Sequence, residues 1–452
     1  MNRLIFREYD IRGIAGTEMN SDLAFLLGRG FGTMARRAGK NRVAIGGDNR
    51  VSTPEIKDRM IEGLCAAGCA VTDVGEVPSP VLYYALYRLD MDTGMMVTAS
   101  HNPPEYNGVK MVLGHASLYG KAIQNLADII ERSDFTAGSG TRETRSVKEE
   151  YLAELKGKFS FRRKLRIGLD CGNGTAGSFI VPLLEALGCE VHGIFIESDG
   201  RFPNHLPDPT VEKNMKDLMV LVKAGGLEAG LGLDGDGDRF GVVDDRGRML
   251  LGDRLLILYA REILAKRPGA AVIFDVKCTK ALAEEVAGAG GEPVMWKTGH
   301  SLIESKLHEM HAPLAGELSG HLYFADEYDG YDDGIYAALR LLRILDATPR
   351  PLSTLLAGVK EYPSTPEMRI DVADERKFGI VDGLRDYYRP RYAISEIDGA
   401  KVFFPDGWAL VRASNTQPAL VVRVEAENEE ALHRIKDEFL AKVDEFKRQA
   451  EG

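Results

Sequence analysis

One pattern occurs three times along this chain, and it limits the folds that the chain can adopt. Each copy begins with a short apolar run that ends in an aspartate, at residues 42–48, 165–170 and 271–275. A helical pattern and two further apolar runs follow each time. Short buried strands that alternate with helices are typical of units built on a mostly parallel sheet. We therefore expect an α/β fold with three related mixed α/β domains.

The last part of the chain follows a different pattern. Beyond residue 366, several short strand-like runs succeed one another without a helix between all of them, and residues 428–449 carry an apolar helical stripe. This pattern predicts a C-terminal α+β domain, which we expect to close over a central cleft. Connectors of small or polar residues separate the units near residues 135–141, 248–252 and 362–366. The expected domains are residues 1–145, 146–249, 250–361 and 362–452.

Composition excludes several classes of protein. The chain of 452 residues is longer than one hydrophobic core supports. Its net charge of −11 argues against a nucleic-acid partner or an anionic membrane surface. The longest apolar run, residues 255–260, is far too short to cross a bilayer. Five scattered cysteines and an N-terminus without a signal-peptide pattern predict a reduced, cytoplasmic protein, so an anionic substrate would need a local basic cleft.

The third apolar run of each unit leads into a loop of chemically active side chains. These loops begin at Thr98, Asp234 and Gly316. In open α/β sheets, ligands bind beyond the carboxyl ends of the strands. We therefore expect the three loops to converge on one site.

The first loop presents Ser100 between a strand end and a rigid Asn-Pro-Pro turn. The serine hydroxyl is a candidate nucleophile, and the neighbouring His101 and Asn102 could donate hydrogen bonds to phosphate oxygens. Lys110 follows an Asn-Gly turn shortly afterwards. The alternative is an ordinary loop with a capping serine.

The second loop alternates Asp234, Asp236 and Asp238 with glycine, so the three carboxylates can face one point. Clustered anions are costly unless a cation lies among them, and Mg²⁺ prefers such oxygen ligands. An EF-hand calcium loop is excluded because its sixth position holds Arg239 instead of glycine. A plain Asp-Gly turn remains the alternative.

Two further loops carry groups for sugar hydroxyls and for an anion. Glu317, Ser319 and His321 alternate along the third loop, and a histidine can move protons near neutral pH. Near the C-terminus, a guanidinium, hydroxyls and an amide follow a strand, at Arg412, Ser414, Asn415 and Thr416. Such groups bind phosphate dianions, although a polar turn is the simpler alternative. Together the four loops indicate a site that moves a phosphoryl group on a sugar.

The loops, in this order, resemble the α-D-phosphohexomutase superfamily, and within it the bacterial phosphomannomutase/phosphoglucomutase group. Residues 6–13, 275–279 and 297–301 are also similar to signatures of that family. The resemblance covers essentially the whole chain. It implies four domains around a central cleft, and a Mg²⁺-dependent isomerase that acts on mannose and glucose phosphates.

The resemblance also implies a role for each residue. Ser100 would carry a phosphoryl group, and Asp234, Asp236 and Asp238 would bind Mg²⁺ together with an oxygen of that phosphoserine. Glu317 and Ser319 would hold the sugar O3 and O4 atoms. Five residues would line the sugar-phosphate site, namely Tyr9, Arg12, Lys277, His300 and His321, and four would grip the non-reacting phosphate, namely Arg412, Ser414, Asn415 and Thr416. Arg239 would offset charge on the transferring oxygens, and His101 is a further candidate catalytic residue.

The implied reaction has two phosphoryl transfers and a hexose 1,6-bisphosphate intermediate. A base must accept the proton of the sugar hydroxyl, and the candidates are Lys110, Arg12 and His321. We favour Lys110, because arginine gives up its proton reluctantly. Two alternatives stay open: a phosphoglucosamine mutase, and a non-catalytic protein that only binds sugar phosphates.

Overall fold

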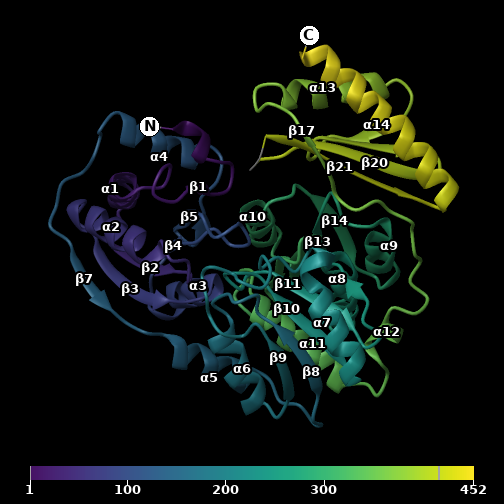
Figure 1. Ribbon diagram of the computed structural model, residues 1–452, viewed down its shortest axis with the longest axis horizontal. Helices are drawn as coiled ribbons and strands as arrows, with labels where there is room; N and C mark the ends of the chain where they lie inside the picture. Colours follow the sequence, from purple (N-terminus) through teal and green to yellow (C-terminus); the bar gives the residue numbers. More distant parts are fainter. Residues whose placement is uncertain (1, 416–417, 452) are drawn as a thin grey trace.

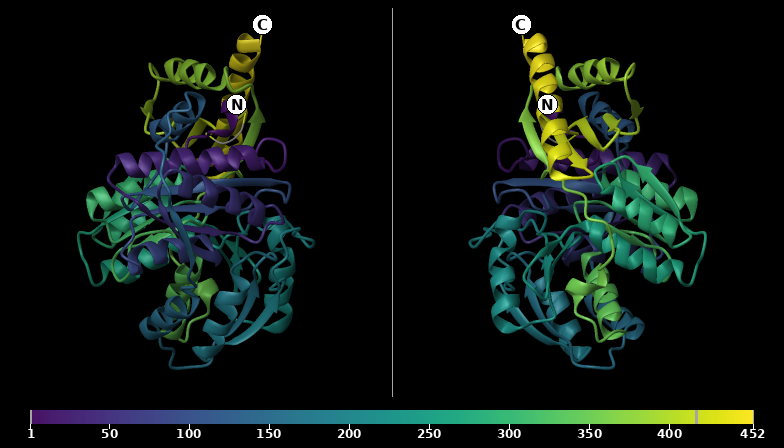
Figure 2. Two further views of the ribbon diagram at one scale, coloured as in Figure 1. Left: turned by 90° about the vertical axis from the view of Figure 1, so that its left-hand side faces the viewer. Right: turned by 90° about the vertical axis from the view of Figure 1, so that its right-hand side faces the viewer.

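The computed structural model describes residues 2–415 and 418–451. Three α/β units are each built on a mixed sheet, and a fourth unit is built on an antiparallel sheet (Figure 1). In Figure 2, both termini lie at the same end of the molecule as the fourth unit. The three-unit pattern of the sequence is thus the actual architecture.

The first unit contains a seven-stranded sheet whose main path runs β1-β5-β4-β2-β3-β7, with β6 paired to β5. Its helix α2 begins with a proline in the first turn, where the missing N–H costs nothing. The elements are η1 (Arg3–Ile5), β1 (Ile11–Ile14), α1 (Ser21–Arg37), β2 (Arg42–Gly47), α2 (Thr53–Ala66), β3 (Ala70–Glu76), α3 (Ser79–Arg88), β4 (Thr93–Val97), β5 (Tyr106–Leu113), β6 (Ala116–Ser117), α4 (Lys121–Glu131) and β7 (Thr141–Thr144).

The second unit contains a five-stranded sheet in the order β12-β11-β10-β8-β9. Helix α7 is followed by Gly226, which caps it in the left-handed conformation, with φ 57°, that a glycine accepts without strain. The elements are α5 (Lys148–Lys158), β8 (Arg166–Asp170), α6 (Gly177–Ala186), β9 (Glu190–Ile194), α7 (Glu212–Gly225), β10 (Ala229–Leu233), β11 (Phe240–Asp244) and β12 (Met249–Leu250).

The third unit contains a four-stranded sheet in the order β14-β13-β15-β16. Helix α11 is capped by Asp333, whose side chain accepts a hydrogen bond from the backbone N–H of Tyr336. The elements are α8 (Gly252–Leu264), β13 (Ala271–Asp275), α9 (Lys280–Gly288), β14 (Glu292–Trp296), α10 (His300–Met310), β15 (Leu314–Gly316), β16 (Leu322–Phe324), α11 (Gly334–Asp346) and α12 (Leu352–Leu355).

All three units share one strand arrangement. A central strand pairs in parallel with two neighbours, and one of these neighbours continues through a loop into an antiparallel strand. The loops lie between β4 and β5, between β10 and β11, and between β15 and β16. These loops are the three that the sequence analysis singled out, so the repeat places them at equivalent positions.

The fourth unit is an antiparallel sheet in the order β17-β21-β20-β19-β18, with helices packed against it. Figure 1 shows α13 and α14 on the outer side of this sheet. Ile435, Phe439 and Val443 of α14 are buried there, as the apolar stripe predicts. The elements are β17 (Met368–Asp371), α13 (Lys377–Tyr388), β18 (Ala393–Ser395), β19 (Ala400–Phe404), β20 (Gly407–Ala413), β21 (Ala419–Ala426) and α14 (Glu429–Glu451).

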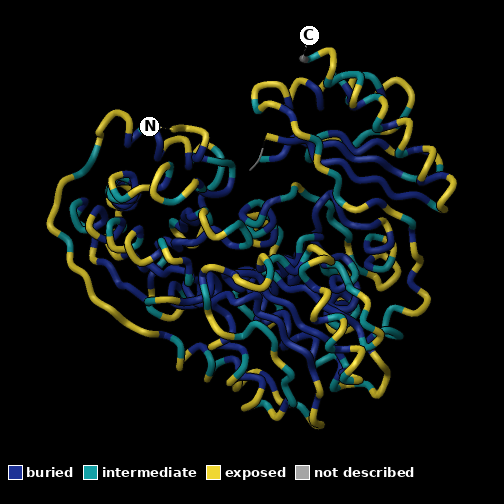
Figure 3. Tube along the Cα trace, in the orientation of Figure 1, coloured by how far each residue is buried: buried dark blue, intermediate teal, exposed yellow. Residues whose placement is uncertain are grey.

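The hydrophobic core is divided into separate clusters, and most of the first unit has a cluster of its own. One hydrophobic cluster joins α3 and Tyr84 of the first unit to the second and third units, whereas the fourth unit has a separate cluster. Val276 of the third unit packs with Trp408 and Leu410 of the fourth. Figure 3 shows the central strands buried along their length. The second and third units therefore give the site a rigid base, and the fourth is joined to them through a much smaller contact.

Several elements lie outside the predictions from the sequence, among them two short strands and one helix. The connector after the first unit contains β7, which pairs in parallel with β3, and the connector near residue 250 contains β12. The C-terminal domain contains the additional helix α13. Among the described residues, no helix combines the length and the apolar character that a membrane crossing needs.

Candidate active site

The three loops meet as the strand ends predicted. Arg239, at the end of the aspartate loop, forms an isolated bridge with His321 of the third loop. The backbone N–H of Phe240 donates to the carbonyl oxygen of Gly320 at 3.0 Å. The hydroxyl of Ser100 reaches across to the aspartate loop. Loops from three separate units thus form one site.

Ser100 is buried and lies directly against Asp234. Its Oγ donates to Asp234 Oδ2 at 2.7 Å and lies 3.1 Å from His101 Nδ1. Its backbone has a φ of 49°, a conformation that a non-glycine residue adopts at a cost. Such strain is typical of functional residues that the surrounding structure holds in place. The hydroxyl is therefore fixed beside the aspartates.

The Ser100 loop is held by Arg50, a residue that the sequence analysis missed. The buried guanidinium donates to the carbonyl oxygens of Ser100 at 2.8 Å, Asn102 at 2.6 Å and Pro103 at 2.6 Å. Its Nε also pairs with Asp48 at 3.1 Å. Five N–H groups on a planar fork suit this task better than a lysine would.

The aspartate loop holds a dense group of buried charges. Asp236 Oδ2 accepts hydrogen bonds from Ser79 Oγ at 2.6 Å, Thr98 Oγ1 at 3.1 Å and Lys110 Nζ at 2.7 Å. Lys110 also pairs with Asp238. Burial alone would lower the pKa of Lys110, but the two carboxylates outweigh it and raise that pKa well above its usual value. Lys110 is thus an ammonium ion that neutralises part of the loop.

The donor set of this loop fits a divalent cation. Asp234, Asp236 and Asp238 each offer a carboxylate oxygen, and these oxygens lie within 4.8 Å of one another. Burial raises the pKa of Asp234 well above its usual value, and the charges of Asp238 and Asp236 add to this effect. The Oδ1 atoms of Asp236 and Asp238 are buried and accept no hydrogen bond. Buried oxygens without partners are suited to bind a cation, and oxygen ligands of this kind suit Mg²⁺.

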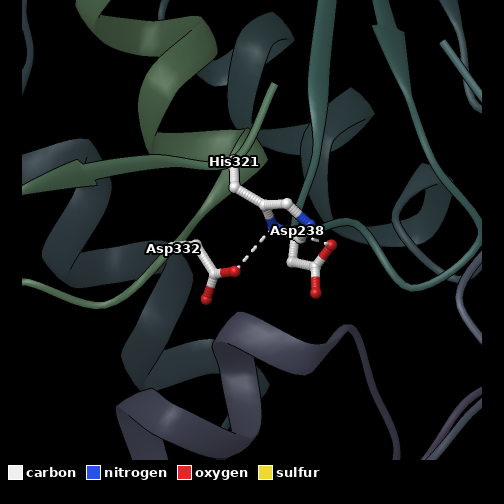
Figure 4. A group of neighbouring side chains, drawn as sticks. All are labelled: Asp238, His321 and Asp332. Atoms are coloured by element: carbon white, nitrogen blue, oxygen red, sulfur yellow. Dashed lines mark hydrogen bonds and ion pairs between the residues drawn. The ribbon is translucent and has the colours of Figure 1, made fainter. Parts of the chain in front are cut away.

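His321 connects the aspartate loop to a residue outside the predicted set. Its Nδ1 lies 2.8 Å from Asp332 Oδ2 (Figure 4). Its Nε2 accepts a hydrogen bond from Arg239 Nε at 3.0 Å. Burial lowers the pKa of His321 to about 4, so the imidazole is neutral. Asp332 could not be predicted as the partner of His321, because it lies 11 positions further along the chain and no local motif marks it.

The remaining groups of the third loop lie together. Ser319 Oγ donates to Glu317 Oε2 at 3.0 Å, and Glu317 Oε1 accepts from the backbone N–H of Gly299. His300 stacks against His321 with ring centroids 5.8 Å apart. Burial lowers the pKa of His300 well below its usual value. Neutral imidazoles, a carboxylate and a hydroxyl are suited to binding sugar hydroxyls.

The fourth-domain loop approaches the first and third units. The hydroxyl of Tyr9 donates to the carbonyl oxygen of Thr298 at 2.6 Å and receives a hydrogen bond from Asn415. Arg412 Nε pairs with Asp398 at 2.7 Å, and its Nη2 is buried without a hydrogen-bond partner. Thr416 lies outside the described residues. A buried guanidinium nitrogen without a partner is suited to an incoming anion.

Three other predicted residues lie near these groups. Arg12 Nη1 donates to Asn102 Oδ1 at 2.7 Å, and its buried Nε has no hydrogen-bond partner. Lys277 is buried between Asp275 at 3.5 Å and Glu367 at 3.3 Å. Ser414 contributes its carbonyl oxygen to Lys377 at 2.6 Å. The local basic groups expected from an acidic chain are thus present, although each has acidic or polar neighbours.

Comparisons with known proteins agree with this arrangement. Four family models match in order: phosphoglucomutase/phosphomannomutase α/β/α domain I over residues 3–137, domain II over 149–247, domain III over 251–362 and the C-terminal domain over 367–442. The chain belongs to the phosphoglucomutase/phosphomannomutase family. Members of this family are isomerases.

Individual members of the family cover nearly the whole chain. A phosphomannomutase/phosphoglucomutase of Pseudomonas aeruginosa is 46% identical over 436 residues, which are 96% of this chain and 94% of the relative. A phosphoglucomutase/phosphomannomutase family protein of Burkholderia thailandensis has a solved structure with a TM-score of 0.93 and 44% identity, covering 99% and 98% of the two chains.

A more distant structure shares the fold of the family. It is an N-acetylphosphoglucosamine mutase of Aspergillus fumigatus, solved in complex with GlcNAc-6P and magnesium. It is 16% identical with a TM-score of 0.62, and the match covers 98% of this chain and 96% of that one. At this identity the likeness concerns the fold alone.

Proposed function

We propose that this protein interconverts hexose 1-phosphates and hexose 6-phosphates through a phosphoserine at position 100. The observation that carries the proposal is the 2.7 Å contact between Ser100 Oγ and Asp234 Oδ2. Ser100 lies in a strained turn whose carbonyl oxygens accept hydrogen bonds from Arg50. The contact holds its hydroxyl against the loop of three buried aspartates. A hydroxyl nucleophile beside a cation site is what phosphoryl transfer requires.

We propose that Asp234, Asp236, Asp238 and the phosphoryl group on Ser100 hold Mg²⁺. When bound, this ion would offset the negative charge that develops on the transferring oxygens. Arg239 supports the same task, because its Nε lies 3.8 Å from Asp234 Oδ2. Lys110, which now pairs with Asp236 and Asp238, would have to share these carboxylates with the ion.

The proposed reaction consists of two transfers. Phosphoserine 100 gives its phosphoryl group to O6 of a hexose 1-phosphate, and the C1 phosphate of the resulting hexose 1,6-bisphosphate then returns to Ser100. Glu317 and Ser319 hold the sugar, while Arg412, Ser414, Asn415 and Thr416 hold the phosphate that does not react. Tyr9, Arg12, His101, Lys277 and His300 complete the sugar-phosphate site.

Lys110 remains our proposed base for the sugar hydroxyl proton. In its present contacts the ammonium group cannot accept a proton, since two carboxylates hold it charged. Acceptance therefore requires that the side chain first moves away from Asp236 and Asp238. His321 is the alternative, but its Nε2 already accepts a hydrogen bond from Arg239.

The preferred sugars are proposed to be mannose and glucose. Mannose and glucose differ only in the configuration at C2. Glu317 and Ser319 would contact O3 and O4, so these contacts would be the same for both sugars. A glucosamine phosphate is the alternative substrate. Rates measured in parallel with mannose 6-phosphate, glucose 6-phosphate and glucosamine 6-phosphate decide between them, and faster turnover of the amino sugar would overturn our choice.

We also place the enzyme in the cytoplasm. All five cysteines are free thiols, and four of them are buried. Free thiols of this kind are typical of proteins in reducing compartments.

A coupled assay of glucose 1-phosphate conversion tests the proposed function. Wild type should turn over glucose 1-phosphate with Mg²⁺ and a trace of glucose 1,6-bisphosphate. The Ser100→Ala variant should fold normally and lose at least about 1,000-fold in kcat, because no other hydroxyl replaces the nucleophile. Equal inertness of both proteins would instead favour the non-catalytic sugar-phosphate binder.

A further inference from the structure

The first unit and the fourth domain meet at an ion pair. Arg7 Nη1 donates to Asp374 Oδ2 at 3.2 Å, and both side chains are partly buried. Arg7 lies in the segment between η1 and β1, whereas Asp374 lies in the turn between β17 and α13. The pair therefore joins two separate units through residues that are 367 positions apart in the sequence.

Asp374 connects this contact to a buried lysine. Its other carboxylate oxygen, Oδ1, accepts a hydrogen bond from Lys377 Nζ at 2.7 Å. Lys377 is the first residue of α13 and is only 4% exposed. Burial would raise the pKa of Asp374, but the hydrogen bonds from Lys377 and Arg7 lower that pKa below its usual value. Asp374 is thus a carboxylate ion held by one cation from each of the two units.

Lys377 also contacts the phosphate loop, residues 412–415, through the main chain. The same Nζ donates to the carbonyl oxygen of Ser414 at 2.6 Å. Close by, the backbone N–H of Val372 donates to the carbonyl oxygen of Pro418 at 3.0 Å. The turn that carries Asp374 is therefore fastened to the same hairpin as the phosphate loop.

A second contact ties the phosphate loop to the same N-terminal segment. Asn415 donates to the hydroxyl of Tyr9, which lies two positions after Arg7. Arg412 Nη2 is buried and has no hydrogen-bond partner among the described residues. Residues 7–9 thus reach the loop at two points, directly through Tyr9 and indirectly through Arg7, while a guanidinium nitrogen of the loop is left for an anion.

The contact between Lys377 and Ser414 has a physical consequence for anion binding. A backbone carbonyl oxygen carries a partial negative charge, so it repels an anion that it faces. Lys377 binds the Ser414 oxygen and keeps it turned toward the ammonium group. A loop whose donors are already oriented loses less conformational freedom when it binds. Lys377 therefore favours anion binding without touching the anion.

We propose that Lys377 is a positioning residue for the phosphate loop, and that the ion pair of Arg7 with Asp374 orients Lys377 when the fourth domain lies against the first unit. The proposal rests on the proposed function, in which this loop holds the phosphate that does not react. It adds that binding of this phosphate and closure of the fourth domain favour each other, because each stabilises the same arrangement.

Binding of glucose 1-phosphate tests the proposal without turnover. Titration calorimetry of the full-length protein in EDTA gives Kd, since the proposed transfer requires Mg²⁺. We expect Kd to rise by at least about 5-fold in Arg7→Gln, Asp374→Asn and Lys377→Met, because each variant lacks one charge-assisted hydrogen bond that orients the loop. With Mg²⁺ present, KM should rise in parallel while kcat changes by less than about 2-fold.

A double variant distinguishes a relay from two independent effects. Arg7 acts on the loop through Asp374 and Lys377, so Arg7→Gln should add little once Lys377 is replaced. The double variant of Arg7→Gln with Lys377→Met should therefore bind within about 2-fold of Lys377→Met alone. Effects that multiply would show that Arg7 acts separately, and this result would overturn the relay.

Two matched controls replace the same residue types away from the phosphate loop. Arg3 pairs with Asp128 and Glu131 inside the first unit. Lys442 pairs with Glu445 on the same helix, α14, at 2.7 Å. Arg3→Gln and Lys442→Met should bind glucose 1-phosphate as wild type does.

Thermal unfolding checks that each variant is folded. Lys377 is buried, and should Lys377→Met fail to fold, the cycle is run with Asp374→Asn in its place. Arg7→Gln and Asp374→Asn alter partly exposed side chains, so they keep the test valid.

The possible failures have different meanings. An unchanged Kd in Arg7→Gln and Asp374→Asn would overturn the proposal, and so would a loss of kcat without a change in Kd. Wild type that binds glucose 1-phosphate but does not convert it with Mg²⁺ and glucose 1,6-bisphosphate would contradict the proposed function alone. Wild type that binds no glucose 1-phosphate would overturn both.

Discussion

Lys110 shows how one side chain determines the state of the site. Its ammonium group pairs with two buried carboxylates, those of Asp236 and Asp238. A bound divalent cation would compete with Lys110 for these oxygens. The stability of the protein and its affinity for Mg²⁺ are therefore coupled through this residue.

The Lys110→Met variant tests this coupling. Removing the ammonium leaves buried carboxylates unpaired, so the free energy of unfolding without metal should fall by about 3–5 kcal/mol. Mg²⁺ should then stabilise the variant more than wild type, because no ammonium competes for its ligands. Denaturant titrations with EDTA and with Mg²⁺ measure both effects, and an equal Mg²⁺ effect in the two proteins would contradict the account.

Glu304 provides a second prediction for a single residue. This carboxyl group lies on α10 against β6 and accepts a hydrogen bond from Ser117 at 2.5 Å. Burial raises its pKa to about 8, the hydrogen bond from Ser117 lowers it in part, and the charge of Asp332 raises it further. The folded protein therefore holds this proton more tightly than the unfolded chain does.

The sign of the pH effect follows from this difference. The contribution of Glu304 to stability is greatest below its unfolded pKa, near 4.3, and is lost as the pH rises to about 8. Glu304→Gln should therefore flatten the pH dependence of unfolding between these values and raise stability at pH 8 by about 1–3 kcal/mol. Denaturant titrations across that range measure it, and parallel curves for the two proteins would refute the assignment.

The candidate reacting groups could be proposed from the sequence, whereas the residues that hold them in place could not. Ser100 and the three aspartates could be recognised because their chemistry depends on local spacing. Arg50, Asp332 and Asp398 could not, since each acts on a residue distant in the sequence and their partners become clear only in three dimensions. Supporting residues carry no local motif.

The contact between α1 and α2 illustrates packing between elements. A Cβ atom on Gly28 would lie 2.0 Å from the carbonyl oxygen of Met60, and one on Gly63 would lie 2.1 Å from that of Phe25. The two helices therefore touch through their backbones. Gly28 and Gly63 thus serve the close packing of the two helices.

Gly28→Ala should separate these helices. We expect the free energy of unfolding to fall by about 2–4 kcal/mol, since the methyl group meets backbone that cannot move aside. Gly157→Ala in α5 is the matched control, because a Cβ atom there meets nothing within 4 Å; it should stabilise by about 0.5–1 kcal/mol. Denaturant titrations compare them, and a neutral Gly28→Ala would disprove the backbone contact.

The elements that could be predicted were those with a strong pattern. The repeated strands of the three units appear at the expected residues, because buried parallel strands are continuous apolar runs. Strand β7 was missed because its four residues are all exposed and polar. Helix α13 was missed because Gly379 and Gly383 weaken its helical pattern. Edge strands and poor helix formers depend on tertiary context.

In the molecule as a whole, the fourth domain contacts both the third and the first units through polar side chains. Asn415 donates to the hydroxyl of Tyr9, and Arg7 pairs with Asp374 at 3.2 Å. The hydrophobic contact with the third unit is a small cluster of three buried residues, Val276, Trp408 and Leu410. Small interfaces of this kind allow domains to move relative to one another. We therefore expect closure over the substrate to depend on the polar contacts between the fourth domain and the first unit.

Tyr9→Phe tests that dependence. The loss of one hydroxyl that links Thr298 and Asn415 should raise KM for glucose 1-phosphate by about 3–10-fold, with a smaller change in kcat. Tyr387→Phe is the control, since Tyr387 packs against Tyr388 and Phe446 away from the site. Steady-state kinetics separate the two constants, and an unchanged KM for Tyr9→Phe would contradict the role of this contact.

The central claim is that Ser100 carries the phosphoryl group beside the aspartate loop. The most direct measurement is mass spectrometry of peptides from protein incubated with glucose 1,6-bisphosphate and Mg²⁺, then quenched in acid. The account predicts one phosphoryl group per chain, on the peptide that contains Ser100, and its loss as glucose 1,6-bisphosphate when excess glucose 1-phosphate is added to the washed protein. Turnover without phosphate on that peptide, or with phosphate on a different residue, would contradict the account.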